Sequence, residues 1–158
     1  MTPNQKAFLD MIAFSEIGEK LLAVSDNGYD VIVGSTPAKP NLLPHYNDCN
    51  RQVISLGNGI KSTASGRYQL LARYYDAYKR QLGLIDFSPE NQDKIALQQI
   101  KECGAIPFIQ NGNFEMAVSK VTHIWASLPN AGYGQHENQL AKLQDAYLAA
   151  GGTLAEGV

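Results

Sequence analysis

The sequence predicts an α+β domain that is mostly helical and contains one small β region. Three observations lead to this prediction. Apolar residues recur at helical spacing over residues 7–18, a β-branched run follows at 29–33, and four more helical patterns occupy the chain after residue 66. There is no internal repeat or low-complexity linker. We therefore expect a single domain over residues 1–158, with a cleft between its β part and its helical part.

Composition narrows the range of functions. The chain has 158 residues and a formal net charge of −2, without basic clusters, so nothing points to nucleic acid or an anionic membrane as partner. The N-terminus lacks the pattern of a secretory signal, and no apolar run is long enough to span a bilayer. Cys49 and Cys103 are too few for a disulfide framework, so free thiols are expected.

The first helical pattern ends on one acid, Glu16. Its apolar side contains Phe8, Leu9, Met11 and Ile12, and its polar side contains Lys6 and Asp10. Glu16 falls on the apolar side, just before Gly18, which can end the helix. Partial burial and the negative end of the helix dipole should both raise the pKa of this carboxyl, as a general acid requires. The plainer alternative is an acid that faces solvent or pairs with Lys20.

The β region is predicted from a turn and two short runs. Asp26-Asn27-Gly28 is a turn signal at the end of a connector, and the run at 29–33 reads as a strand. Three prolines make 36–44 an irregular loop, and a weaker strand at 52–56 is expected to pair with the first. Gly57-Asn58-Gly59 then breaks the pattern.

Glycines and prolines delimit the later helices. One begins after residue 66, includes Tyr68 and Gln69 in its first turn, and ends at Gly83. A second runs from Ser88-Pro89-Glu90 to Gly104, with Cys103 on its apolar face, and 105–109 is a short turn. A third starts at Asn111-Gly112-Asn113 and extends through Trp125. After a flexible loop at 127–135, a last helix stops at Gly151-Gly152.

Several kinds of site are disfavoured. No serine sits in a nucleophile elbow, neither cysteine has a histidine in a recognisable motif, and the glycine pairs do not follow a strand and open a helix. His45, Asp48 and Cys49 could nominally bind a metal, but three loop residues without a fourth ligand favour a structural role. His123 and His136 are expected to face solvent. No metal or cofactor is predicted.

Six blocks of the chain resemble a known family in collinear order. They are AFLDMIAFSE, NGYDVIVG, KSTASGRYQLL, RQLGLIDFSPENQD, ALQQIKECGA and IWASLPNAGYGQ. Together they are similar to the endolysins of bacteriophage lambda and its relatives, and the resemblance spans nearly the whole chain. It implies a lysozyme-like fold and a lytic transglycosylase, which cleaves the bond between N-acetylmuramic acid and N-acetylglucosamine in peptidoglycan and leaves a 1,6-anhydromuramic end.

The resemblance also implies where the enzyme acts and which residue acts. The family's catalytic glutamate falls on Glu16, the acid that the helix pattern singles out. The implied protein is a phage or prophage endolysin that works as a monomer on peptidoglycan glycan strands. It would wait in the host cytoplasm until a holin lesion admits it to the wall in the periplasm.

Two rival functions stay open. A true lysozyme would need a second carboxylate, about 5 Å from the first for retention or about 6.5 to 9.5 Å for inversion. The candidates are Glu19, Asp26, Asp30 and Asp48. Asp30 opens the predicted strand, although a turn residue that bonds local backbone is the better reading of it. The other rival is a wall-binding module without turnover.

Sugar binding is expected from amides, hydroxyls and flat rings in two loops. Gln69, Tyr133 and Gln135 have suitable side chains, whereas Tyr68 begins an apolar face and is more easily read as core. The segments 35–51 and 128–138 resemble the two mobile lips of the family's cleft. Two segments depart from the family pattern, the connector 17–28 and the prolines of the first lip. The slightly acidic net charge also departs from it, so electrostatic attraction to the anionic wall should be weaker.

Overall fold

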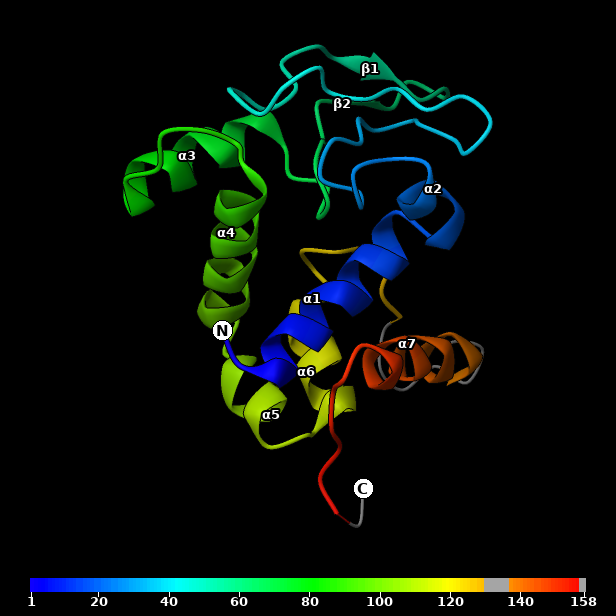
Figure 1. Cartoon of the computed structure of the whole chain (residues 1–158), viewed down its shortest axis with the longest axis vertical. Helices are drawn as coiled ribbons and strands as arrows, with labels where there is room; N and C mark the ends of the chain where they lie inside the picture. The colour runs from blue at the N-terminus through cyan, green and yellow to red at the C-terminus, as the bar shows by residue number, and fades with distance from the viewer. Residues whose placement is uncertain (130–136, 157–158) are drawn as a thin grey trace. The chain divides into compact units, whose positions relative to one another are not determined.

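The chain forms two compact units. This computed structural model describes residues 1–129 and 137–156. The helical unit comprises Met1–Glu16 and Ala96–Val158, and the loop unit comprises Ile17–Ile95. One helix, α4 (Pro89–Glu102), begins in the loop unit and ends in the helical unit (Figure 1). No helix in the described part of the chain is both long enough and apolar enough to cross a bilayer.

The helical unit is built around α1 (Pro3–Glu16). This helix packs against α7 (Glu137–Ala149) and α5 (Ile106–Gln110), and α5 contacts α6 (Phe114–Val121). The predicted apolar side of α1 is confirmed, and two alanines extend it; the buried residues are Ala7, Phe8, Leu9, Met11, Ile12 and Ala13. Phe114 contacts aromatic rings of both other helices, edge-on to Phe8 with the ring centroids 6.2 Å apart and tilted against Tyr147 with the centroids 4.9 Å apart. The packing of its buried side along the whole helix therefore holds the C-terminal end of α1 in place.

Three predicted helices are confirmed, each at one predicted boundary, although the helix expected after residue 66 begins later, at Ala72. Helix α3 (Ala72–Leu82) ends at Gly83, which adopts φ 65°, and α4 begins at Pro89. Helix α7 ends at Ala149, before the predicted Gly151-Gly152. In each case a residue with a special backbone requirement marks the boundary, which is why the sequence could place it.

Two predictions in the helical unit were wrong in extent. The predicted turn at 105–109 is helix α5, because Pro107 occupies the first turn, where a missing N–H costs nothing. The helix predicted through Trp125 ends at Val121, although the Trp125 N–H still bonds the Val121 carbonyl at 3.1 Å and Trp125 is buried. Apolar residues continue at helical spacing after Val121, but the backbone there forms irregular turns.

Cys103 was predicted to be a core residue, but the structure does not bury it fully. It is half-buried, and its Sγ lies 3.6 Å from Nε2 of the exposed His123. His123 is exposed, as predicted, and both cysteines are free thiols.

The β region of the loop unit is smaller than predicted. The run at 29–33 is not a strand: Val31 and Ile32 form only isolated bridges, to Leu42 and Ser65. These two adjacent side chains are both buried, so the apolar run reflects core packing and not the alternation of a strand. The facing segment contains Pro37, Pro40 and Pro44 and cannot donate a continuous ladder.

Within residues 1–129 and 137–156 the regular sheet is one hairpin. Strand β1 (Ile54–Ser55) lies inside the predicted weak strand but pairs with β2 (Lys61–Ser62), not with 29–33. The intervening Gly57-Asn58-Gly59 has positive φ at all three residues, which closes the turn. A short helix, α2 (Glu19–Ala23), also replaces part of the predicted connector. The Asp26-Asn27-Gly28 turn is confirmed, with Asn27 and Gly28 at positive φ.

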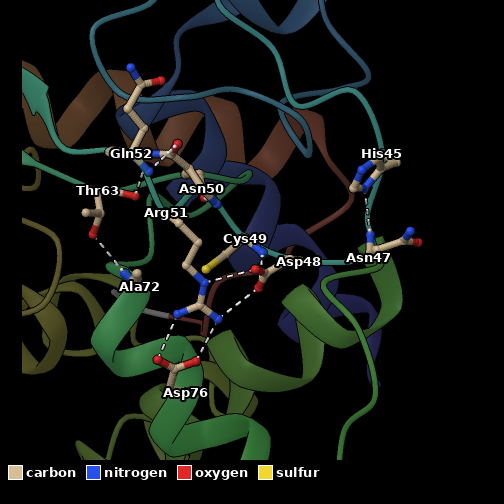
Figure 2. Close-up of polar contacts among 11 residues, drawn as sticks. His45, Asn47, Asp48, Cys49, Asn50, Arg51, Gln52, Thr63, Ala72 and Asp76 are labelled. Carbon is tan, nitrogen blue, oxygen red and sulfur yellow. Dashed lines mark hydrogen bonds and ion pairs between the residues drawn. The ribbon is translucent and has the colours of Figure 1, made fainter.

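Arg51 connects the proline-containing loop at 35–51 to α3. Its guanidinium donates to both oxygens of Asp48 at 2.9 Å and to both oxygens of Asp76 at 2.8 Å (Figure 2). These bonds hold the pKa of each carboxyl below its usual range. Two residues before Arg51, Cys49 is buried in a cluster with Leu70, Tyr75, Phe87 and Ile95. The loop that contains the prolines is thus anchored at its C-terminal end.

Candidate active site

Glu16 is the last residue of α1, and its side chain is half-buried. Burial raises the pKa of its carboxyl from 4.5 to about 7, while a hydrogen bond with the Ser127 side chain opposes the rise. The direction agrees with the sequence prediction, and burial is the cause that the helix pattern indicated. A carboxyl with this pKa exists in both protonation states near neutral pH, so it can give up a proton and take one back.

Ser15, the residue before Glu16, contacts a second serine from the other end of the chain. The Oγ atoms of Ser15 and Ser127 are 2.8 Å apart. All three residues belong to the helical unit. Neither serine was predicted from the sequence. Ser15 precedes Glu16 in the block AFLDMIAFSE, and Ser127 lies within the block IWASLPNAGYGQ. Their position in two blocks that resemble the family is the sequence feature that could have pointed to them.

Asp30 uses its carboxylate locally. Its Oδ1 accepts from the Asp26 N–H at 2.9 Å, within the turn that precedes it. This is the turn role that the sequence analysis favoured. Asp26 accepts from the Tyr46 hydroxyl, and Asp48 is bound by Arg51. Asp26, Asp30 and Asp48 therefore each have a bonding role within the loop unit.

Gln69 lies outside the helix in which it was predicted. Helix α3 begins at Ala72, and Gln69 instead ends a tight turn from Gly66, with φ 51°. The turn is closed by paired backbone bonds between Ser65 and Leu70 at 3.1 and 2.9 Å. The Gln69 Nε2 donates to the carbonyls of Gly66 at 2.8 Å and Val31 at 3.2 Å. These bonds orient the side-chain amide.

Tyr68 is buried in a polar network of the loop unit. Its hydroxyl donates to Asp93 Oδ1 at 2.6 Å and accepts from Arg67 Nη1 at 3.1 Å. The Tyr29 hydroxyl also donates to Asp93, at 3.0 Å, and the Arg67 guanidinium lies over the rings of Tyr29 and Tyr68. Burial raises the pKa of Tyr68. The network joins the turn before Tyr29 to the first half of α4.

Replacing Tyr68 by Phe is expected to lower the free energy of unfolding by about 1–2 kcal/mol, because the change removes a buried hydroxyl bonded to a carboxylate. Urea denaturation would measure this loss, and Tyr74→Phe at an exposed ring serves as the matched control. A raised KM for glycan with unchanged stability would instead show that Tyr68 contacts sugar.

Some predicted residues lie outside the described part of the chain. Tyr133, Gln135 and His136 belong to the segment 130–136, which the structure does not describe. Leu128 and Pro129, which lead into it, are buried. Among the described residues no group of three His, Cys, Asp or Glu side chains is placed to hold a metal ion. Of the three residues that could nominally bind a metal, His45 accepts from the Asn47 N–H through Nδ1 at 3.3 Å, and Asp48 binds Arg51.

Comparison with known proteins agrees with this architecture. A profile of the Endolysin family matches residues 6–154. The chain is 50% identical to the endolysin of Escherichia phage lambda over 154 residues, which cover 97% of this chain and 94% of the relative. It is 45% identical to the endolysin of Escherichia phage P2, over 96% of this chain and 95% of that relative.

Solved structures give the same result for the fold. A structure described as lysozyme from bacteriophage lambda superposes with a TM-score of 0.85 at 46% identity, covering 98% of this chain and 97% of that one. A second, bacteriophage lambda lysozyme complexed with a chitohexasaccharide, gives 0.84 at 47% identity with the same coverage. The predicted lysozyme-like fold is confirmed, and the chain belongs to the endolysin family.

Proposed function

We propose that this endolysin cleaves the glycan strands of peptidoglycan by transglycosylation, with Glu16 as the single catalytic acid and base. The observation that carries the proposal is the pKa of about 7 at Glu16, the last residue of a helix whose apolar side is buried. The endolysin relatives and the lambda lysozyme solved with a chitohexasaccharide support a glycan substrate. Residues 1–158 would act as one catalytic domain and as a monomer.

Two proton transfers complete the reaction. Protonated Glu16 donates its proton to the glycosidic oxygen between N-acetylmuramic acid and N-acetylglucosamine as the C1–O bond breaks, so that positive charge develops at C1. The muramic C6 hydroxyl then attacks C1, and its proton passes to the Glu16 carboxylate. The products are a 1,6-anhydromuramic end and a free N-acetylglucosamine hydroxyl, and Glu16 is again protonated.

The pKa suits both steps. A general acid that titrates near the working pH is protonated often enough to begin the reaction, and its conjugate base is strong enough to finish it. An acid at its ordinary pKa of 4.5 would be almost wholly ionised at neutral pH and could rarely start the first step. A second carboxylate is not needed, because the attacking hydroxyl belongs to the substrate.

Substrate contacts are proposed for three side chains. Gln69 has its amide nitrogen bound to two carbonyls, which leaves its orientation fixed, and an amide oxygen held in this way suits a sugar hydroxyl. Tyr133 and Gln135 remain candidates on residue type alone. We assign supporting roles to Tyr68 and Asp30, since their polar atoms bond residues of the loop unit itself.

Access to the wall is proposed to depend on a holin. The protein would accumulate in the host cytoplasm and reach the periplasmic wall after the holin opens the inner membrane. Expression of the chain alone should then leave cells intact, whereas co-expression with a holin should lyse them. Lysis by the chain alone would overturn this part of the proposal.

Mass spectrometry of digested peptidoglycan tests the chemistry. We expect muropeptides one water lighter than the products of hydrolysis, and these should resist borohydride, because an anhydro end has no free aldehyde to reduce. Products that all gain two hydrogens on reduction would instead assign a hydrolytic lysozyme that uses a second acid such as Asp30. Binding to peptidoglycan without any soluble product would assign a wall-binding module.

A further inference from the structure

The side-chain amide of Gln92 binds the backbone of three separate segments of the loop unit. Gln92 lies in the first turn of α4 and is 3% exposed. Its Oε1 accepts from the Arg67 N–H at 3.0 Å, and its Nε2 donates to the carbonyls of Tyr29 at 3.0 Å and Phe87 at 2.9 Å. All of these residues belong to the loop unit. One buried amide therefore joins the segment 29–31, the turn at 66–69 and the segment that leads into α4.

These bonds fix the direction in which the Gln92 amide faces. The amide nitrogen has two protons and faces two carbonyls, whereas the amide oxygen faces an N–H group. Turning the amide over would place its oxygen against both carbonyls and its nitrogen against the Arg67 N–H, so only the observed orientation makes the three bonds. Gln92 also lies close against the turn, because a Cβ on Gly66 would be 2.4 Å from Oε1.

Two of the same three segments orient the amide of Gln69. Its Nε2 donates to the carbonyls of Gly66, in the turn, and of Val31, two residues after Tyr29. The Gly66 N–H also donates to the Val31 carbonyl, at 2.8 Å, so the turn and the segment 29–31 meet at one oxygen. Because Gln92 joins these two segments, it sets the separation of the two carbonyls that direct the Gln69 amide.

Gln69 is the residue through which this turn is accessible. Within residues 64–70, all of which the structure describes, Gln69 is half-buried and the others are buried. Its φ of 51° is uncommon for a residue other than glycine, so the surrounding contacts must hold the backbone there. Both Nε2 protons are bonded, which leaves Oε1 as the amide atom that can accept from a sugar hydroxyl.

We propose that Gln92 is a positioning residue for glycan binding: it holds the turn at 66–69 against the segment 29–31 and so directs the Gln69 amide oxygen toward a sugar hydroxyl. This inference rests on the proposed contact between Gln69 and the glycan. Gln92 is buried and acts through Gln69. Its effect should appear in substrate affinity, because a misdirected amide weakens binding equally before and during the reaction.

The test uses variants of the full chain. Gln92→Met keeps the length of the side chain and removes all three hydrogen bonds, and Gln69→Ala removes the proposed sugar contact itself. The matched control is Asn91→Ala. The Asn91 amide is 9% exposed and lies in the same turn of α4, but it donates to Asp86, to the carbonyl at 3.1 Å and to Oδ1 at 2.7 Å.

Three quantities are measured for each variant. Calorimetry gives the affinity for a chitohexasaccharide, the kind of ligand bound to the lambda lysozyme. Turnover of peptidoglycan gives kcat and KM. The ¹H–¹⁵N signals of the Gln69 side-chain amide, assigned from their absence in Gln69→Ala, report the surroundings of that amide directly.

Gln92→Met should weaken chitohexasaccharide binding about 5-fold, the loss expected for one hydrogen bond between neutral groups. KM should rise by a similar factor, while kcat should change by less than about 2-fold. Gln69→Ala should lose about as much affinity, and Gln69→Ala combined with Gln92→Met should lose no more than Gln69→Ala alone, since both act on one contact. The Gln69 amide signals should move in Gln92→Met. Asn91→Ala should lower the urea midpoint but leave these signals and the affinity unchanged.

A second variant covers the case in which Gln92→Met does not fold. Gln92→Glu keeps an acceptor for the Arg67 N–H and, while the new carboxyl is protonated, one of the two donors. Burial should keep that carboxyl protonated at about pH 5, where the same comparisons are made. We expect the Gln69 amide signals to move and the affinity to fall, by less than in Gln69→Ala.

Two results would overturn the inference. One is a set of Gln69 amide signals that stays in place in the folded Gln92 variant. The other is a combined variant whose loss of binding free energy equals the sum of the single losses, which would show that Gln92 acts on binding by another route. The proposed sugar contact fails separately: Gln69→Ala would then bind the chitohexasaccharide as tightly as the unmodified chain, whatever the Gln92 variants do.

Discussion

Replacing Glu16 by Gln is expected to lower the rate of peptidoglycan cleavage by about 10²–10⁴-fold, the range for removal of a general acid. Gln has nearly the same shape but neither gives nor accepts a proton at this position. The loss should appear in kcat, because an amide can still occupy the space of the protonated carboxyl when glycan binds. Turbidity loss of purified cell walls measures the rate, and a sedimentation assay measures binding.

The same substitution should stabilise the protein at alkaline pH. The pKa of Glu16 is raised from 4.5 to about 7, so between these pH values the folded chain holds a proton that the unfolded chain releases. The contribution of Glu16 to the free energy of unfolding is therefore greatest below pH 4.5, and it falls as pH rises through 7. At about 1.4 kcal/mol per pH unit, the ionised carboxyl costs up to about 3 kcal/mol.

Thermal melts at two pH values check this stability change. Gln remains neutral, so Glu16→Gln should melt higher than the unmodified protein at pH above 7 and at nearly the same temperature below 4.5. Each kcal/mol corresponds to about 2–4 °C in a chain of this size. Equal gains at both pH values would show that packing, and not ionisation, causes the difference. Loss of activity without any alkaline gain would contradict the raised pKa.

Replacing Gly66 by Ala is expected to lower the free energy of unfolding by about 2–4 kcal/mol, through backbone strain and overpacking together. Gly66 has φ +85°, and a Cβ there would lie 2.4 Å from Gln92 Oε1 and 2.7 Å from the Phe87 ring. Neither can withdraw easily, because Phe87 is buried and Gln92 Oε1 accepts the Arg67 N–H at 3.0 Å. The tight turn that presents Gln69 depends on this close approach.

Gly57 provides a matched control for this second prediction. Its φ is +87°, nearly that of Gly66, but a Cβ would meet nothing within 4 Å. Gly57→Ala should therefore show the backbone strain alone, about 1 kcal/mol. The difference between the two variants in urea denaturation measures the crowding at Gly66. Equal losses at both positions would mean that the neighbours of Gly66 rearrange freely.

The success of the sequence prediction depended on how local each signal was. Pro89, Gly83 and Gly151-Gly152 mark the ends of helices because their own backbone requirements decide the boundary. The strand predicted at 29–33 failed for the opposite reason. Its apolar residues do pack into the core, but the adjacent Val31 and Ile32 are both buried and do not alternate. A strand also needs a partner with free N–H groups, and the proline-rich segment opposite it forms only one bridge, at Leu42.

The sequence by itself determined the family, the helical framework and the choice of Glu16, because amphipathic periodicity and collinear blocks are properties of the chain as written. Only the tertiary structure decided how far the Glu16 pKa rises, that Ser15 meets Ser127, and that Gln69 ends a left-handed turn instead of opening a helix. Each of these depends on contacts between residues distant in sequence, since desolvation and hydrogen bonding arise only when folding brings those groups together.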